Sequence, residues 1–220
     1  IGVASVTADA TIDGGTGAIN TAAMTVADAS TLTVGTGAVG APTIASVTGA
    51  NGGGAASNLT LNSTGVASVG AVGTNIGTVT VTQSGGTTFS STVDAVAVTL
   101  TDTTGTIQFD GALTATDLNT AAKGYGVSLL GGSTIANAVT FSNTGTTQIG
   151  DATGDTNTFN GGVTATAGAV TASGSVVTSE DNLALGAVTL VEAQTLTLDT
   201  ANTGGGNITV AVCYTQRTLP

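Results

Sequence analysis

The stretch TIQFDGALTAT, residues 106–116, has an echo in NTFNGGVTAT, residues 157–166. Phe109 aligns with Phe159, each phenylalanine is followed two positions later by glycine, and both stretches end in Thr-Ala-Thr. Apolar residues take alternate positions around Phe109, and threonine or glutamine fills the positions between them. Such repetition is typical of a chain built from similar units that stack on one another.

The same alternation recurs along most of the chain. In each stretch Leu, Ile, Val or Phe takes one parity and Thr, Ala, Asn or Gln takes the other, as in a strand with one buried face. The stretches are TLTV (31–34), NLTL (58–61), TVTV (78–81), VAVTL (96–100), TIQF (106–109), AVTF (138–141), AVTL (187–190), TLTL (195–198) and NITV (207–210).

The spacing of the units separates the possible β folds. The interval from Phe89 to Phe109 is about 20 residues, and that from Phe141 to Phe159 is similar. A β-sandwich would show hairpin turns every ~8–12 residues, whereas the connectors here are uneven GG, GGG and TG clusters. We therefore predict an all-β, parallel β-solenoid over residues 1–210, with rungs of about 20 residues.

The apolar parity of these units predicts an interior ladder. Roughly eleven rungs at ~4.8 Å would make a rod about 50 Å long. The expected interior residues are Val79, Val81, Val98, Leu100, Ile107, Phe109, Val139, Phe141, Leu196 and Leu198.

Composition supports order and excludes several partners. Hydrophobic residues make up 40% of the 220 residues and charged residues only 7%, which argues against a disordered chain. The net charge is −11, from thirteen acids against Lys123 and Arg217. We expect no nucleic-acid binding and no attraction to anionic lipid, because both need clustered cations. No apolar run is long enough to insert into a membrane.

Two segments depart from the alternation. The segment DLNTAAKGYGVSLL, residues 117–130, is predicted to be a projecting loop or short helix. Residues 211–220 contain Arg217 and the single cysteine, Cys213, and are predicted to be an atypical tail or cap. A single cysteine excludes a disulfide within the chain. Because the chain begins at Ile1 rather than Met, we expect a processed product or a segment of a longer protein.

One glycine-rich stretch formally matches a nucleotide motif. GTGAVG, residues 35–40, fits the G-x-G-x-x-G fingerprint, which needs a helix directly after it to receive the pyrophosphate. Pro42 and a stretch without helical periodicity follow instead. We predict no dinucleotide site here.

One loop offers oxygen ligands. Asp151, Asp155 and Asn157 lie close together around Gly154, and calcium prefers several such oxygens. The spacing of an EF-hand is not met, and Asp, Asn and Gly are also the ordinary residues of a solvated turn. We predict a solvated turn and no cofactor, with calcium at these three residues as the alternative.

The inventory of reactive side chains argues against catalysis. The chain has no histidine, which removes the commonest general base and metal ligand. Cys213 stands alone near the C-terminus, and Glu180–Asp181 is the adjacent pair of acids. Neighbouring residues in a strand face opposite sides, so this pair could act together only in a turn. We predict that the protein is not an enzyme.

The repeat style resembles that of large bacterial surface proteins. The resemblance is to filamentous-haemagglutinin-like exoproteins and to autotransporter passengers such as the rickettsial outer-membrane proteins, and it implies a right-handed parallel β-helix exported to the cell surface. The units that carry it are NLTLNSTG (58–65), GTIQFDGALTA (105–115), NTFNGGVTATAGAVTASG (157–174) and AQTLTLDTANTGGGNITV (193–210).

These features lead to three functional expectations. The first is an extracellular structural or adhesive scaffold, a stalk or passenger segment whose partners are host or neighbouring-cell surface molecules. The alternative is a self-assembling subunit of an extracellular filament or surface layer, whose copies join end to end. A carbohydrate-active β-helix is the third hypothesis, and it requires a groove with two or three carboxylates.

Overall fold

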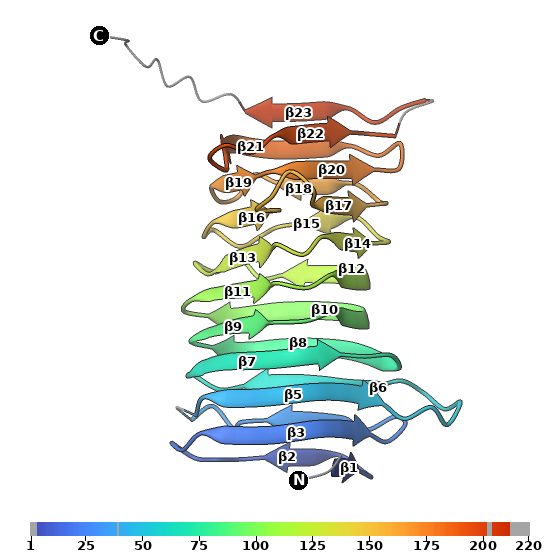
Figure 1. The fold of residues 1–220 in the computed structure, drawn as a ribbon, viewed down its shortest axis with the longest axis vertical. Helices are drawn as coiled ribbons and strands as arrows, with labels where there is room; N and C mark the ends of the chain where they lie inside the picture. Colours follow the sequence, from blue (N-terminus) through green and yellow to red (C-terminus); the bar gives the residue numbers. More distant parts are fainter. Residues whose placement is uncertain (1–3, 39, 202–203, 212–220) are drawn as a thin grey trace.

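The computed structural model describes residues 4–38, 40–201 and 204–211 (Figure 1). The described residues form a coil of 23 strands without any helix. The strands are β1 (Ala4–Val6), β2 (Ala10–Ile12), β3 (Ile19–Val26), β4 (Thr31–Val34), β5 (Pro42–Gly49), β6 (Ser57–Asn62), β7 (Val66–Val72), β8 (Ile76–Ser84), β9 (Gly86–Phe89), β10 (Val93–Thr103), β11 (Thr106–Phe109), β12 (Leu113–Thr120), β13 (Gly126–Leu129), β14 (Ser133–Ile135), β15 (Val139–Thr140), β16 (Thr147–Ile149), β17 (Thr156–Phe159), β18 (Val163–Ala165), β19 (Val170–Ala172), β20 (Gly174–Thr178), β21 (Leu183–Leu190), β22 (Leu196–Asp199) and β23 (Ile208–Ala211).

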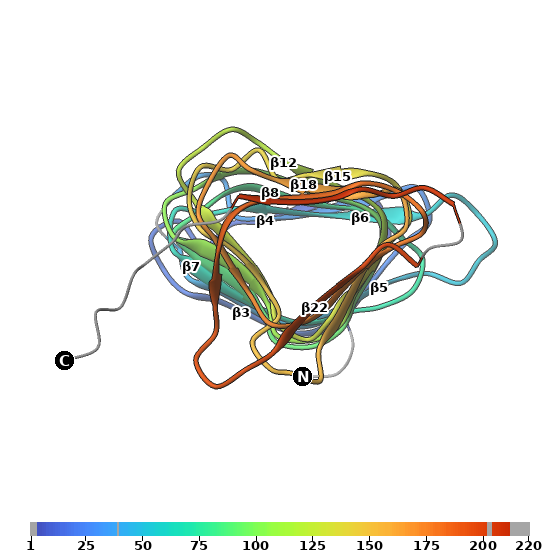
Figure 2. The same cartoon turned by 90° about the horizontal axis from the view of Figure 1, so that it is seen from above.

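Each turn of the coil has three strand-bearing faces, which enclose a triangular section (Figure 2). Face 1 carries β9, β11, β13, β16 and β19; face 2 carries β1, β14, β17, β20 and β22; face 3 carries β2, β4, β6, β8, β15, β18 and β23. The strands β3, β5 and β7 bend from face 1 to face 2, β10 and β12 bend from face 2 to face 3, and β21 bends from face 3 to face 1. All pairs between successive turns are parallel, so the predicted β-solenoid is confirmed.

The coil is right-handed. In Figure 1 the front strands β3 and β5 run from left to right while the chain climbs from the N-terminal to the C-terminal end. Viewed from the C-terminal end, the chain therefore turns anticlockwise as it approaches the reader (Figure 2). This is the hand that parallel crossover connections adopt almost always.

Register holds along face 2 through the whole described coil, whereas face 3 has irregularities between β6 and β8 and between β21 and β23. One column on face 2 passes through ten turns, and each member is the register partner of the next. At ~4.8 Å per turn, ten turns extend over about 48 Å. The column consists of Ala4, Met24, Val47, Val72, Val93, Leu113, Ser133, Asn157, Val176 and Leu198.

The core is the continuous apolar interior of the coil. Each of the nine predicted stretches coincides with a strand or overlaps one, and the predicted ladder from Val79 to Phe141 is buried. Leu196 and Leu198 are only partly buried, because β22 pairs with β20 on one side and closes no further described turn. Alternation places the apolar side chains inside because successive residues of a strand point to opposite faces.

The two phenylalanine pairs are not equivalent. Phe89 and Phe109 are register partners on face 1, and their rings stack. Phe141 and Phe159 meet edge to face at 6.2 Å, but the register partner of Phe159 is Ile135 rather than Phe141. The interpretation of the interval from Phe141 to Phe159 as one rung was therefore wrong, whereas the interval from Phe89 to Phe109 is one complete turn.

The echo of residues 106–116 in residues 157–166 is displaced by one face of the triangle. Thr106–Thr116 covers β11 on face 1 and then β12 on face 2. Asn157–Thr166 covers β17 on face 2 and then β18 on face 3. The echo marks a recurrent local unit of strand, glycine corner and strand, rather than two stretches that lie over one another.

The predicted loop over residues 117–130 is much shorter than expected. Residues 117–120 belong to β12 and residues 126–129 form β13, so the connection between the two strands is residues 121–125. Tyr125 is fully buried, accepts a hydrogen bond from the Ala121 N–H and donates one to the Leu100 carbonyl, both at 2.9 Å. The buried aromatic ring anchors this turn, whereas Lys123 remains exposed and pairs with Asp102 at 3.7 Å.

Glycines close one corner of the triangle, between face 3 and face 1. A Cβ atom added at Gly105 would clash with the carbonyl oxygen of Gly85, one turn below. The backbone of the two turns approaches so closely at Gly105 that a Cβ atom does not fit there without a shift. The segment 211–220 begins with Ala211 in β23, and its remaining residues, including Cys213, lie outside the described part of the chain.

Candidate functional site

The three residues considered as calcium ligands do not form one cluster, because Asn157 is separated from the other two. Asp151 and Asp155 lie in the turn between β16 and β17, on the outside of the coil. Asn157 belongs to β17, is fully buried and accepts a hydrogen bond from the Ser133 hydroxyl at 2.8 Å. Its side chain therefore points into the interior, while the two carboxylates stay outside.

The carboxylate of Asp155 serves the backbone of its own turn. Its Oδ2 accepts hydrogen bonds from the N–H groups of Asp151 and Ala152, both at 2.8 Å. Partial desolvation raises the pKa of Asp151, and a hydrogen bond to Asp155 and the negative charges of Asp155 and Asp110 raise it further. The arrangement is that of the solvated turn predicted from the sequence.

The glycine motif of residues 35–40 lies at a corner of the coil. Gly35 follows β4 directly, and its N–H donates to the Ile12 carbonyl at 2.8 Å. The next element is strand β5, which starts at Pro42. A helix N-terminus, which a dinucleotide fingerprint needs, does not follow the motif.

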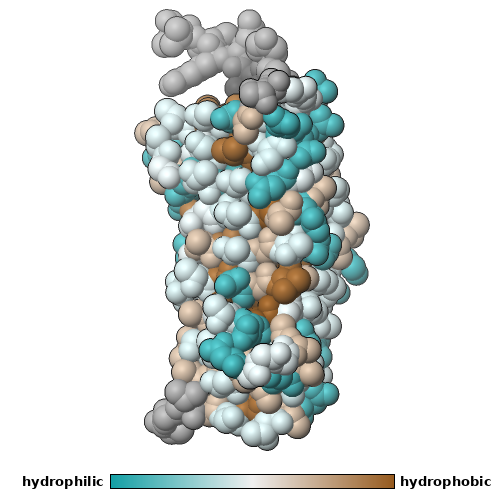
Figure 3. Space-filling view, turned by 90° about the vertical axis from the view of Figure 1, so that its right-hand side faces the viewer, coloured by the Kyte–Doolittle hydropathy of each residue, from teal (hydrophilic) through white to brown (hydrophobic). Residues whose placement is uncertain are grey.

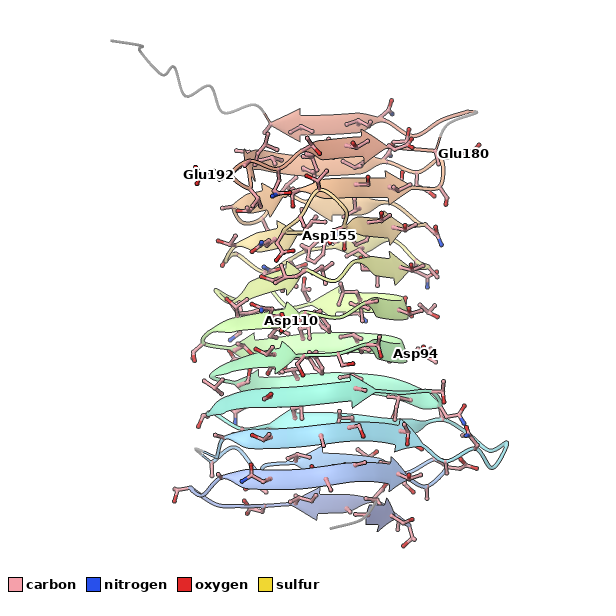
Figure 4. The ribbon with its side chains drawn as sticks, in the orientation of Figure 1. Asp94, Asp110, Asp155, Glu180 and Glu192 are labelled. Atoms are coloured by element: carbon pink, nitrogen blue, oxygen red, sulfur yellow. The ribbon has the colours of Figure 1, made fainter. Side chains whose placement is uncertain are left out.

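The adjacent acids Glu180 and Asp181 occupy the turn between β20 and β21. The Glu180 N–H donates to the Thr200 carbonyl at 2.9 Å, which ties the turn to the next one. Figure 4 shows the labelled carboxylates spread over different turns and sides of the rod. Within residues 4–38, 40–201 and 204–211, no three or more His, Cys, Asp or Glu side chains gather in a way that could hold a metal ion.

The outer surface of face 3 carries columns of aligned polar side chains. One column of outward side chains stays in register over five turns, beside a second column formed by Thr31, Asn58 and Thr78. The length of chain between successive members of the first column varies, and the extra residues lie in corners such as the loop of residues 50–56. The first column consists of Thr11, Thr33, Thr60, Thr80 and Thr99.

A groove lies at the corner between face 2 and face 3. Its volume is about 420 Å³, within the range of roughly 300–1,000 Å³ that ligand sites occupy. Its lining includes Asp94, Val96 and Thr114 of the continuous strands β10 and β12. Figure 3 shows an apolar patch about half-way along this side of the rod.

Sequence reasoning missed this groove, although a signal was present. Asp94 and Thr114 are register partners, and Thr134 lies above them, each one complete turn further along the chain. These positions could have been aligned from the period alone. The hollow itself could not be predicted, because it depends on how the corner segments of several turns lie over one another.

The described part of the chain has no helix that could cross a membrane. Comparison of the chain with protein-family models, with curated proteins and with solved structures finds no match. The fold and the surface chemistry are thus the basis for any functional conclusion.

Proposed function

We propose that this chain is part of an extracellular structural and adhesive scaffold, a stalk or passenger segment of a bacterial surface protein, and that it carries no catalytic centre. The observation that carries this proposal is the unbroken register of ten turns along face 2. A solenoid gains length in proportion to the number of its turns, and each turn contacts only its neighbours. Such a chain is suited to spanning distance.

The backbone hydrogen bonds between turns should make the coil resistant to proteolysis. Interior strands such as β8 and β10 are hydrogen-bonded on both sides within the coil, which leaves a protease little extended backbone to bind. The outer threonine column of face 3 is uncharged and polar, so this side of the coil is compatible with contact with water. Both properties suit a scaffold outside the cell.

The location can be tested directly in the organism that produces the protein. Antibodies against the purified chain are applied to intact and to permeabilised cells, and bound antibody is located by immunogold electron microscopy. We expect label on the outside of intact cells, at a distance from the membrane. Label that appears only after permeabilisation would contradict the proposal.

Self-assembly is the alternative, and the terminal strands of the described coil favour it. In the described part, β1 pairs only with β3, and β23 pairs only with β21, so their outer edges offer unpaired backbone groups. Electron micrographs of the purified protein test this alternative, because it requires ordered polymers, whereas a stalk segment remains as single rods.

A carbohydrate-cleaving activity has less support. Hydrolysis of a glycosidic bond normally uses two carboxyl groups that flank the bond. The groove at the corner of faces 2 and 3 has one carboxylate, that of Asp94, among its lining residues. We therefore propose a binding role for this groove rather than a catalytic one.

A further inference from the structure

We propose that the groove at the corner between face 2 and face 3 binds a basic side chain, lysine or arginine, presented by an extended segment of a partner protein. This inference goes beyond the scaffold function and does not depend on where the protein is located. It rests on the shape of the groove, on its apolar floor and on the charge at its rim.

The shape follows from two strands that turn the corner without a loop. β10 and β12 run continuously from face 2 to face 3, with Val96 and Thr116 at the bend. One turn below, the chain leaves the ladder between Val72 and Ile76, and Asn75 adopts a positive φ of 61°. The groove is lined from both levels, since Asn75 and Val96 both contribute to it.

The floor of the groove is apolar. Ile76, Ala95 and Ala115 line it and are almost completely buried, with exposed fractions of 2%, 6% and 5%. Val96 lines the groove and has 54% of its surface exposed, so an apolar side chain is open to solvent at the side of the groove. The aliphatic stem of a lysine or arginine would stabilise the complex by covering this apolar surface, while the charged end of the side chain stays near water.

The rim supplies the matching charge. Asp94 lies on the outer column of face 2, directly below Thr114 and Thr134 in register. The Lys123 ammonium pairs with Asp102 instead, and the whole chain carries thirteen acids against two basic residues. A cation that enters the groove therefore meets one carboxylate and a lining with three threonines, Thr114, Thr116 and Thr134, in an acidic surrounding field.

Other ligand classes fit this groove less well. An anionic ligand such as a phosphate would need cations or clustered N–H groups, and the lining includes neither lysine nor arginine. The lining also has no aromatic ring on which a sugar or a nucleobase could stack. A side chain with a positive end and an apolar stem matches the shape of the groove, its apolar floor and the negative charge at its rim.

Nuclear magnetic resonance titration of the intact chain tests the proposal. The probe is a capped five-residue peptide that contains two lysines separated by alanine, and the control peptide has glutamine in place of both lysines. We expect the lysine peptide to shift the amide resonances of residues 94–96 and 114–116 progressively. The glutamine peptide should leave these resonances unchanged at the same concentration.

Two variants with the same change in charge separate a specific site from general attraction. Asp94→Asn should weaken binding of the lysine peptide about two- to five-fold, the range expected for one exposed ion pair. Asp110→Asn is the matched control, because Asp110 lies at a different corner of the rod (Figure 4), and it should leave the affinity unchanged. Val96→Ser should weaken binding by removing the apolar side of the groove.

Three results would overturn the inference. The first is an absence of shifts at residues 94–96 up to about 10 mM peptide, where even binding weaker than about 1 mM becomes visible. The second is an equal loss of affinity in Asp94→Asn and Asp110→Asn, which would indicate diffuse attraction to an acidic rod. The third is binding of free spermidine as tight as that of the lysine peptide, which would exclude recognition of a polypeptide.

Discussion

The ring of Phe89 lies over the ring of Phe109, with ring centroids 4.8 Å apart and an angle of 5° between the planes. Aromatic pairs in proteins usually prefer offset or edge-to-face contacts. Here the register of the coil sets the geometry, because Phe89 and Phe109 are partners in adjacent parallel strands. The spacing between the rings matches the spacing between strands.

This stack should be a major contributor to stability. Both phenylalanines are fully buried, so Phe109→Ala leaves a cavity and is expected to lower the free energy of unfolding by about 3–5 kcal/mol. Phe109→Leu is the matched control, since it keeps an apolar side chain of similar volume and should cost less than about 2 kcal/mol. Urea denaturation followed by circular dichroism measures both; equal losses would contradict a role for the ring.

The glycine corner yields a prediction with a matched control. Gly105→Ala forces a methyl group against the Gly85 carbonyl oxygen, and we expect a loss of about 2 kcal/mol or more. Gly124→Ala adds the same methyl group where no atom lies within 4 Å and should change stability by less than about 1 kcal/mol. Comparable melting temperatures for the two variants would show that the corner is less tightly packed than described.

Deletion of one complete turn should be tolerated, whereas deletion of half a turn should not. Val93 and Leu113 are register partners, so removal of residues 94–113 joins Val93 to Thr114 and preserves every column above. Removal of residues 94–103 also starts after Val93, but it joins Val93 to Thr104. The residues of β11, which belong to face 1, would then lie on face 2. The first variant should unfold cooperatively with β-type circular dichroism, and the second should not. Folding of both would argue against strict register.

Tyr125 should make stability depend on alkaline pH. Burial raises the pKa of its phenol above the usual value of 10.0, so the folded state retains the phenolic proton at pH values where the unfolded chain loses it. The contribution of Tyr125 to the free energy of unfolding is therefore fully present below about pH 10. It is lost as the pH rises above that value. Tyr125→Phe should show a shallower decline between pH 9 and pH 11 in urea titrations.

The same substitution has a cost at neutral pH. Tyr125→Phe removes the hydroxyl that bonds to the Leu100 carbonyl and the Ala121 N–H. We expect a loss of only about 0.5–1.5 kcal/mol, because these two backbone groups keep the hydrogen bond between them. An unchanged stability at pH 7 together with an unchanged alkaline slope would show that the phenol is not buried as described.

The turn that contains Asp151 and Asp155 should make the melting temperature depend on pH but not on calcium. The pKa of Asp151 is raised in the fold, so its ionisation destabilises the folded state as the pH rises through the usual range of carboxyl groups. Asp151→Asn should therefore raise the melting temperature at pH 7 and leave it unchanged at pH 3. Calcium at millimolar concentration should not shift the melting temperature, because Asn157 lies inside the coil; a clear stabilisation would revive the calcium site.

Several features could have been predicted more fully from the sequence. Asn157 shares its parity with Phe159, so the alternation already places both side chains on the inner side of β17. In contrast, the burial of Tyr125 had no local signal, because glycines surround it and no alternation leads into it. The groove beside Asp94 could have been predicted in part. The alignment of Asp94 with Thr114 follows from the repeat length of about 20 residues, whereas the depth of the groove depends on how the corner segments of several turns lie over one another.

The sequence by itself determined that the chain coils and which side of each strand faces inward. Both properties are local, because period-two alternation orients side chains within a strand and glycines permit close corners. The tertiary structure alone decided which residues lie over one another, such as Phe89 on Phe109 and Asn157 on Ser133. Successive turns differ in length mainly at their corners, and three faces of similar composition cannot be distinguished until backbone hydrogen bonds fix the register.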